Sequence, residues 1–210
     1  MKFKIIPVTD FMQNCTLIWD EKHLDAVIID PGGDIEILIT EIEKRALNLQ
    51  YTLLTHGHLD HVGGCAAIAS YFSVPIFGPQ KEDEFLIKGL AAQSKIFGIE
   101  KYAAFTPDRY LQEGDEIRFA DIQLTVLHCP GHTPGHVVFV NHTDKLISMG
   151  DVLFNGGIGR TDFPKSNRET LIHSIKTKIL PLGDDYHFTS GHGPMSSLAN
   201  ERQYNPFLQD

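Results

Sequence analysis

Short apolar blocks alternate with polar turns along most of the chain, and glycine, proline or acidic residues separate the blocks. Blocks of this length with alternating or continuous apolar positions predict β-strands. Strands are predicted at 3–8, 15–19, 26–29, 51–55, 116–119, 123–127, 137–141, 145–149 and 186–189. Two of these strands are predicted to form a hairpin around Ala120-Asp121.

Three longer segments repeat apolar residues at the spacing of an α-helix. They span 35–47, 62–72 and 167–180, and Asn167 is the predicted N-cap of the last one. The stretch 82–97 is predicted to be irregular and partly helical. Both halves of the chain are rich in strands and carry helices of their own. This pattern favours an α/β (α+β) fold in which two sheets pack together and helices lie outside.

The composition is that of an ordinary globular protein, with 42% hydrophobic and 21% charged residues. A length of 210 residues without repeats or a linker predicts a single domain over residues 1–210. The net charge is −9 and the basic residues are scattered, so nucleic acid is not an expected partner. No apolar stretch approaches the ~18 residues of a membrane span, so no membrane association is expected.

The three cysteines, Cys15, Cys65 and Cys129, form neither an even disulfide set nor a paired zinc-finger spacing. Reduced thiols are therefore expected, and Cys129 is interpreted as a small buried packing residue. The apolar run at the amino end is too short for a signal peptide. These features together predict a cytoplasmic protein.

Histidine and carboxylate side chains gather directly after predicted strands. Four of them follow the strand 51–55, and three more follow later apolar runs, each next to a glycine. The seven residues are His56, His58, Asp60, His61, His132, Asp151 and His192. Imidazole and carboxylate groups are ligands of zinc, iron and manganese. Seven ligands exceed what one tetrahedral ion uses, so the set predicts two ions that share a bridging carboxylate, assigned to Asp151.

These motifs resemble those of the metallo-β-lactamase superfamily. The resemblance rests on the order and spacing of the seven ligands and on the opening Asp30-Pro31-Gly32, and it covers essentially the whole chain. The segments 131–136 (GHTPGH) and 159–164 (GRTDFP) are most similar to the short, single-domain bacterial hydrolases of the glyoxalase II type. The resemblance implies a four-layer αββα sandwich with the metal site between the sheet edges.

The same resemblance implies how the ligands are shared. The first ion would be held by His56, His58 and His132. The second ion would be held by Asp60, His61 and His192, with Asp151 as the bridge. The expected cofactors are two divalent metal ions per chain, assigned as zinc, with iron or manganese as alternatives.

A hydroxide shared by two such ions would be a nucleophile at neutral pH, because a metal lowers the pKa of bound water to about 7. The resemblance implies a glutathione thioester, such as S-lactoylglutathione, as the small-molecule substrate. Asp60 and Asp151 are the predicted catalytic residues. Asp60 would orient the hydroxide and hold its proton, and a role as a ligand only fits Asp60 equally well.

Other polar residues near the ligands have two interpretations each. Asp30 is either a simple turn residue or an acceptor that fixes the tautomer of a ligand histidine. Arg160 follows the bridging ligand and is either a surface charge or a bidentate clamp for a substrate carboxylate. His128 and His136 flank His132 and are interpreted as structural or supporting residues rather than as ligands.

Several other functions share these motifs. A persulfide dioxygenase with one iron is the second hypothesis after the thioester hydrolase, because its relatives keep the same ligands and a similar 159–163 loop. A lactonase is the third hypothesis. A nuclease is disfavoured by the acidic charge, and a non-catalytic metal-binding module by the complete ligand set. Two-domain glyoxalase II enzymes carry a C-terminal helical domain, whereas this chain ends at Asp210. We therefore expect no such domain and weaker substrate binding; the sequence leaves the oligomeric state open.

Overall fold

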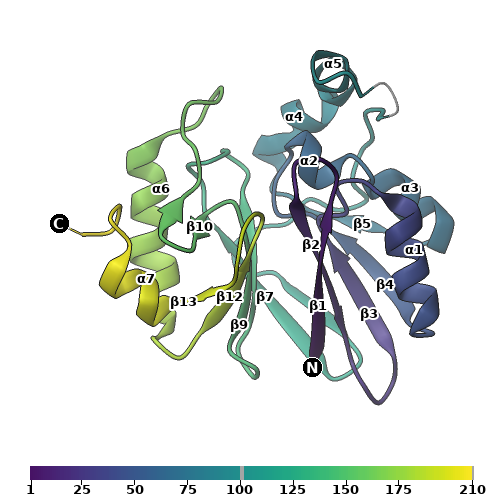
Figure 1. Ribbon diagram of the computed structural model, residues 1–210, viewed down its shortest axis with the longest axis horizontal. Coiled ribbons are helices and arrows are strands. Elements are labelled where there is room, and N and C mark those ends of the chain that lie inside the picture. The colour runs from purple at the N-terminus through teal and green to yellow at the C-terminus, as the bar shows by residue number, and fades with distance from the viewer. Residues whose placement is uncertain (100–101, 210) are drawn as a thin grey trace.

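Two β-sheets lie face to face in the computed structural model, which describes residues 1–99 and 102–209 (Figure 1). The first sheet has the order β1-β2-β3-β4-β5, formed by Lys2–Val8, Gln13–Trp19, Asp25–Ile29, Asn48–Leu53 and Ile76–Phe77. The second has the order β13-β12-β9-β8-β7-β6, formed by Ser196–Ser197, His187–Ser190, Leu146–Gly150, Val137–Asn141, Ile122–His128 and Glu116–Phe119. A separate two-stranded ribbon consists of β10 (Leu153–Phe154) and β11 (Gly157–Ile158).

Helices cover the outer face of each sheet (Figure 1). The first sheet is covered by α1 (Ile35–Lys44) and α3 (Cys65–Phe72). The second sheet is covered by α6 (Arg168–Ser174), the π-helix η2 (Ile175–Ile179) and α7 (Leu198–Tyr204). The remaining short helices are α2 (Leu59–Val62), η1 (Lys81–Asp83), α4 (Glu84–Lys88), α5 (Leu90–Ile96) and η3 (Leu180–Leu182).

Apolar side chains fill the layer between the two sheets. Val27, Ile29 and Leu53 of the first sheet pack in one cluster with Val126 and Phe139 of the second. Each fully buried side chain of this size contributes about 1.5–3 kcal/mol of transfer free energy. Further apolar clusters join each sheet to its own helices. The four-layer αββα sandwich that the sequence predicts is therefore confirmed.

The strands that carry the predicted ligands end at the same edge of the sandwich. Strands β3 and β4 are parallel, as are β9 and β12, and β7 and β9 are both antiparallel to β8 between them. The loops that follow these strands therefore leave the sheets together. Backbone hydrogen bonds join the two sheets at this edge, from Val137 N to Thr55 O (2.8 Å) and from Asn14 N to Gly191 O (2.7 Å).

The predicted strands are confirmed, most of them with shifted ends, but one predicted helix ends earlier than expected and another begins earlier and is interrupted. The helix predicted over 35–47 stops at Lys44, because Ala46 adopts a left-handed φ of 52°. The helix predicted over 62–72 begins at Leu59 as α2 and restarts at Cys65 as α3. The pair Gly63-Gly64 separates the two pieces and packs closely against neighbouring segments.

The last predicted helix, 167–180, is confirmed at its start and irregular at its end. The side chain of Asn167 caps it by accepting a hydrogen bond from Thr170 N (2.8 Å). Beyond Ser174 the helix continues as the π-helix η2. Helix α7 and the short strands β5, β10, β11 and β13 have no counterpart among the predicted elements. None of the helices in the described ranges is both long and apolar enough to cross a membrane.

Candidate metal centre

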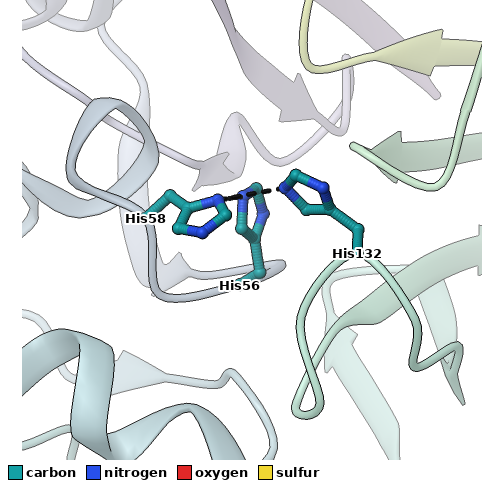
Figure 2. Close-up of side chains that lie close together, drawn as sticks. All are labelled: His56, His58 and His132. Atoms are coloured by element: carbon teal, nitrogen blue, oxygen red, sulfur yellow. Dashed lines mark hydrogen bonds between the residues drawn. The ribbon is translucent and has the colours of Figure 1, made fainter. Parts of the chain in front are cut away.

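Three histidines from two separate loops meet at one point (Figure 2). His56 and His58 lie in the loop between β4 and α2, and His132 lies in the loop between β7 and β8. The Nδ1 atom of His58 is 3.1 Å from Nε2 of His56 and 3.0 Å from Nε2 of His132. Two residues of one loop and one residue of the other thus place ring nitrogens close together. We call His56, His58 and His132 the three-histidine cluster.

A second group lies beside the first and consists of Asp60, His61 and His192, which we call the outer cluster. Asp60 and His61 belong to helix α2, whereas His192 follows strand β12. The Nε2 atom of His192 is 3.1 Å from Oδ2 of Asp60, and Nε2 of His61 is 3.8 Å from the same oxygen. Potential ligand atoms from all three residues lie within 4.8 Å of one another.

Asp151 stands between the two clusters. Its Oδ1 atom is 3.4 Å from Nε2 of His61, and its Oδ2 atom is 3.6 Å from Nε2 of His132 and 3.8 Å from Nε2 of His192. One carboxylate thus lies near nitrogens of both clusters. This is the arrangement that a bridging ligand requires.

The donor set fits cations. His61 Nε2 and Asp151 Oδ1 are buried and have no hydrogen-bond partner within the described part of the chain. A buried polar atom without a partner costs about 1–3 kcal/mol, and a bound cation would remove that cost. Nδ1 of His58 also lies within 3.1 Å of Nε2 of both His56 and His132, so three imidazole nitrogens present lone pairs to a shared space. The described protein groups leave His61 Nε2 and Asp151 Oδ1 without a hydrogen-bond partner, and a bound metal ion would coordinate both.

The protonation states of the three-histidine cluster suit metal binding, which requires neutral imidazole. Burial lowers the pKa of His56 well below its usual value, and burial with the neighbouring His132 lowers the pKa of His58 to about 3. Burial raises the pKa of Asp151, but His61 and His132 outweigh that effect and hold the pKa well below its ordinary value. The Asp151 side chain is therefore an ionised carboxylate.

His61 behaves differently. Burial lowers its pKa, but the surrounding carboxylates, led by Asp151 and Asp60, raise it well above the usual value. The carboxylates around the ring therefore favour a positive charge at this position, which is either a proton on the ring or a cation bound beside it. Asp30 faces the other side of the ring, with Oδ2 at 2.8 Å from His61 Nδ1, and accepts hydrogen bonds from the backbone and hydroxyl of Thr55.

Acceptors on the far side of the rings orient three of the histidines. Nδ1 of His61 contacts Asp30, as the tautomer-fixing interpretation of Asp30 requires, and Nδ1 of His132 lies 2.8 Å from the backbone oxygen of Arg160. Nδ1 of His192 lies 3.2 Å from the backbone oxygen of Phe11. A proton held on Nδ1 leaves Nε2 free for a metal. The two backbone oxygens carry no sequence signal, and only the fold brings them to the rings.

The flanking histidines support the site without entering it. Nε2 of His136 accepts a hydrogen bond from the backbone N–H of Asp151 (3.0 Å), and its ring stacks on His56 at 4.6 Å between centroids. Nε2 of His128 lies 2.8 Å from the backbone oxygen of Pro134. Cys129 is fully buried, and burial raises the pKa of its thiol to about 12, so it is a packing residue.

The loop after β11 brings an aromatic and a cationic residue to the metal centre. The ring of Phe163, which the sequence analysis did not single out, lies 4.8 Å from that of His58 and 5.7 Å from that of His132. The exposed guanidinium of Arg160 lies 4.6 Å from the Phe163 ring centroid and donates two hydrogen bonds to Asp162 (3.0 and 2.7 Å). Arg160 is thus near the site, and Asp162 occupies its bidentate face.

Comparisons with known proteins give a consistent result. A family model described as the metallo-beta-lactamase superfamily matches residues 8–192. The chain is 51% identical to the hydroxyacylglutathione hydrolase GloC of Haemophilus influenzae over 209 residues, 99% of this chain and 98% of the relative. The solved BLEG-1 B3 metallo-beta-lactamase has a TM-score of 0.92 and 34% identity over the full length of both chains. The solved TTHA1623, in a di-iron-bound form, has a TM-score of 0.88 and 32% identity over 98% of this chain and all of that one.

Proposed function

This chain belongs to the metallo-beta-lactamase superfamily and is a metal-dependent hydrolase, and we propose that it cleaves the thioester of a hydroxyacylglutathione such as S-lactoylglutathione. The observation that carries this substrate class is the 51% identity with a hydroxyacylglutathione hydrolase over almost the whole of both chains. A substrate of this class combines a reactive carbonyl with carboxylates at a distance. The residues around the two clusters offer a group for each of these features.

In the proposed site, His56, His58 and His132 hold one ion, and Asp60, His61 and His192 hold the second. Asp151 bridges the two, and the ions are proposed to be zinc, with iron or manganese as alternatives. Divalent ions bound there would polarise the thioester carbonyl and lower the pKa of water to near neutrality. The carboxylate of Asp151 lies within 3.8 Å of nitrogens from both clusters, which supports the shared arrangement.

Asp60 is the proposed proton acceptor. Burial raises the pKa of its carboxyl, but His61 and His192 outweigh that effect and lower it, so the group is ionised at neutral pH. Its side chain is 21% exposed, which leaves it open to incoming water. A carboxylate in this position orients water and takes up its proton during attack. The departing thiolate is a good leaving group, so no strong general acid is needed beside the sulfur.

Arg160 and Phe163 are proposed to receive the substrate. The apolar ring of Phe163 lies against His58 and His132 and limits the water that reaches the three-histidine cluster. Arg160 presents an exposed guanidinium that Asp162 now binds in a bidentate manner. A glutathione carboxylate would replace Asp162 in the same geometry. Asp162 would then act as a placeholder that keeps the guanidinium in position.

The state of the cysteines and the net charge bear on the compartment and the partners of the enzyme. All three cysteines are free and buried, which supports a reducing compartment, proposed here as the cytoplasm. The net charge of −9 disfavours nucleic acid as a partner. The proposed partner is thus a small-molecule thioester, handled by one domain that comprises residues 1–210.

The test is direct. Zinc-loaded protein should hydrolyse S-lactoylglutathione and release free glutathione, measured with a thiol reagent, without oxygen uptake. Metal analysis of protein purified without chelator should give close to two ions per chain. Oxygen uptake with glutathione persulfide by iron-loaded protein, together with no thioester cleavage by the zinc form, would overturn the proposal in favour of a dioxygenase. Faster hydrolysis of a cephalosporin than of the thioester would instead favour a β-lactamase, the activity named for BLEG-1.

A further inference from the structure

A fully buried carboxylate outside the seven proposed ligands connects the two loops of the three-histidine cluster. Asp83 ends helix η1 and is 0% exposed. Its Oδ2 atom accepts hydrogen bonds from Gly57 N (2.9 Å) and from Thr133 Oγ1 (2.7 Å), and its Oδ1 atom accepts one from Gly135 N (2.6 Å). Gly57 lies between two proposed ligands, and Thr133 directly follows the third. One side chain therefore holds both ligand loops.

A local structural role does not account for this carboxylate. Asp83 occupies the N-cap position of α4, yet its side chain makes no capping hydrogen bond. Three hydrogen-bond donors from the ligand loops compensate its charge, with a smaller electrostatic contribution from His128. Burial raises the pKa of Asp83 to about 6 although its three donors lower it, which leaves the group ionised at neutral pH. A buried, unpaired charge is costly, and here the compensating donors all come from the ligand loops.

The glycines of the two motifs provide room for this contact. A Cβ atom on Gly135 would lie 2.5 Å from Gln80 O and 2.8 Å from Asp83 Cγ. A Cβ atom on Gly57 would lie 2.8 Å from Leu86 Cβ and 3.1 Å from Asp83 O. Both glycines therefore allow the segment that carries Asp83 to approach the ligand loops. Their presence in the His-Gly-His and Pro-Gly-His motifs is explained by Asp83 as well as by the metal.

We infer that Asp83 is a positioning residue that locks the loop of His56 and His58 to the loop of His132, so that the three nitrogens are in place before a cation arrives. Without the lock, ion binding would have to order two independent loops, and the ordering cost would weaken affinity. The effect should fall mainly on the ion of the three-histidine cluster. This inference rests on the metal sites of the proposed function, but it does not depend on the identity of the substrate.

The experiment titrates zinc into metal-free protein against a chelating dye and resolves two dissociation constants. Asp83→Asn keeps the shape but presents an amide N–H₂ to the donors, and it should weaken the tighter site by up to about 10–100-fold, the range that follows the loss of a group supporting a metal site. Thr133→Val removes one donor and should weaken the same site by a smaller factor. Thr133→Ser keeps the hydroxyl and should restore affinity close to that of the wild type.

The matched control is Glu201→Gln, at a second fully buried carboxylate. Glu201 accepts hydrogen bonds from Ser196, Gly156 and Asn205, none of which is a proposed ligand. This variant should lose stability and keep both zinc affinities. If Asp83→Asn and Thr133→Val lose stability but bind both ions as the wild type does, Asp83 has only a structural role and the inference is overturned. A wild type that binds two zinc ions without cleaving the thioester would overturn the proposed substrate alone, and the same titration would still decide the role of Asp83.

Discussion

The two halves of the metal centre differ in how firmly the protein holds them. In the three-histidine cluster, His56 is 0% and His132 is 3% exposed, and Asp83 ties their loops together. In the outer cluster, the side chain of His192 is 33% exposed and its Nδ1 contacts a single backbone oxygen at 3.2 Å. Two of the three histidines in the first half are buried and His58 is partly exposed, whereas in the second half only His61 is buried.

The half with the more buried and better bonded side chains is the one expected to be preformed before an ion binds. Buried groups with several hydrogen bonds open rarely, whereas exposed groups with few contacts open at low cost. The three-histidine cluster should therefore bind its ion more tightly. In the outer cluster, the partly exposed side chains of Asp60 and His192 are open to water. Asp151 belongs to both halves, and its removal should abolish the difference between them.

The largest effect is expected for Asp151→Ala. Because the carboxylate lies between both clusters, its loss should release metal while the fold remains. Turnover should fall by more than ~100-fold, the upper end of the effect of mutating a group that only supports a metal ligand. Metal analysis, hydrolysis assays and circular dichroism measure the three quantities. Full metal content and activity in this variant would remove the bridging assignment and the comparison based on it.

A matched pair of histidine variants tests the order of affinities. His132→Ala should abolish tight zinc binding, because it removes a nitrogen from the preformed cluster. His192→Ala should lower the stoichiometry from about two ions to about one while the tight site is retained. Equilibrium dialysis at micromolar free zinc distinguishes the two variants. If His192→Ala loses the tight ion and His132→Ala keeps it, the halves have been ranked in the wrong order.

Arg160→Ala tests the entrance on the loop beside His58. It should raise KM about fivefold with little change in kcat, since an exposed ion pair contributes about 1 kcal/mol or less. Arg160→Lys should restore part of the loss, because a point charge cannot form the planar fork. Arg118→Ala is the control, since Arg118 is also exposed and pairs with an acidic residue two positions away, Glu116. Equal KM values for Arg160→Ala and the wild type would return Arg160 to an ordinary surface charge.

The smallest effect is expected for Glu201→Gln, measured by urea unfolding across pH. Burial raises the pKa of Glu201, but hydrogen bonds, led by that from Ser196, outweigh it and hold the pKa below its ordinary value of 4.5. Because the folded-state pKa is lowered, the stabilisation is complete above that ordinary value and is lost as the pH falls through the folded-state value. The variant should be less stable than the wild type by about 1 kcal/mol at pH 7. A deficit that persists unchanged at pH 3 would contradict the ionised hydrogen-bonded carboxylate.

The sequence predicted the fold, and the seven candidate ligands lie close together in the structure, but several of the groups that support them were not predicted. Alternating and continuous apolar runs identified the strands, because burial on a sheet face leaves a periodic signal. The start of helix α1 was predicted correctly, but its end was missed, because Leu47 stays in the apolar core after the helix has ended at Lys44. Helix α7 was missed entirely, and it is this helix that carries Glu201.

The sequence alone specified the available chemistry: seven histidine and aspartate residues close to the ends of strands, whose side chains are of the types that bind divalent metals. The packing of the chain sets which of these side chains lie together, which ring nitrogen faces the shared space, and how firmly each cluster is held. The orientation of the rings and the position of the loops depend on the backbone oxygens of Arg160 and Phe11 and on the buried carboxylate of Asp83. A backbone oxygen is the same in every residue, and an isolated aspartate between polar neighbours resembles any surface charge. Only long-range packing gives these groups their roles.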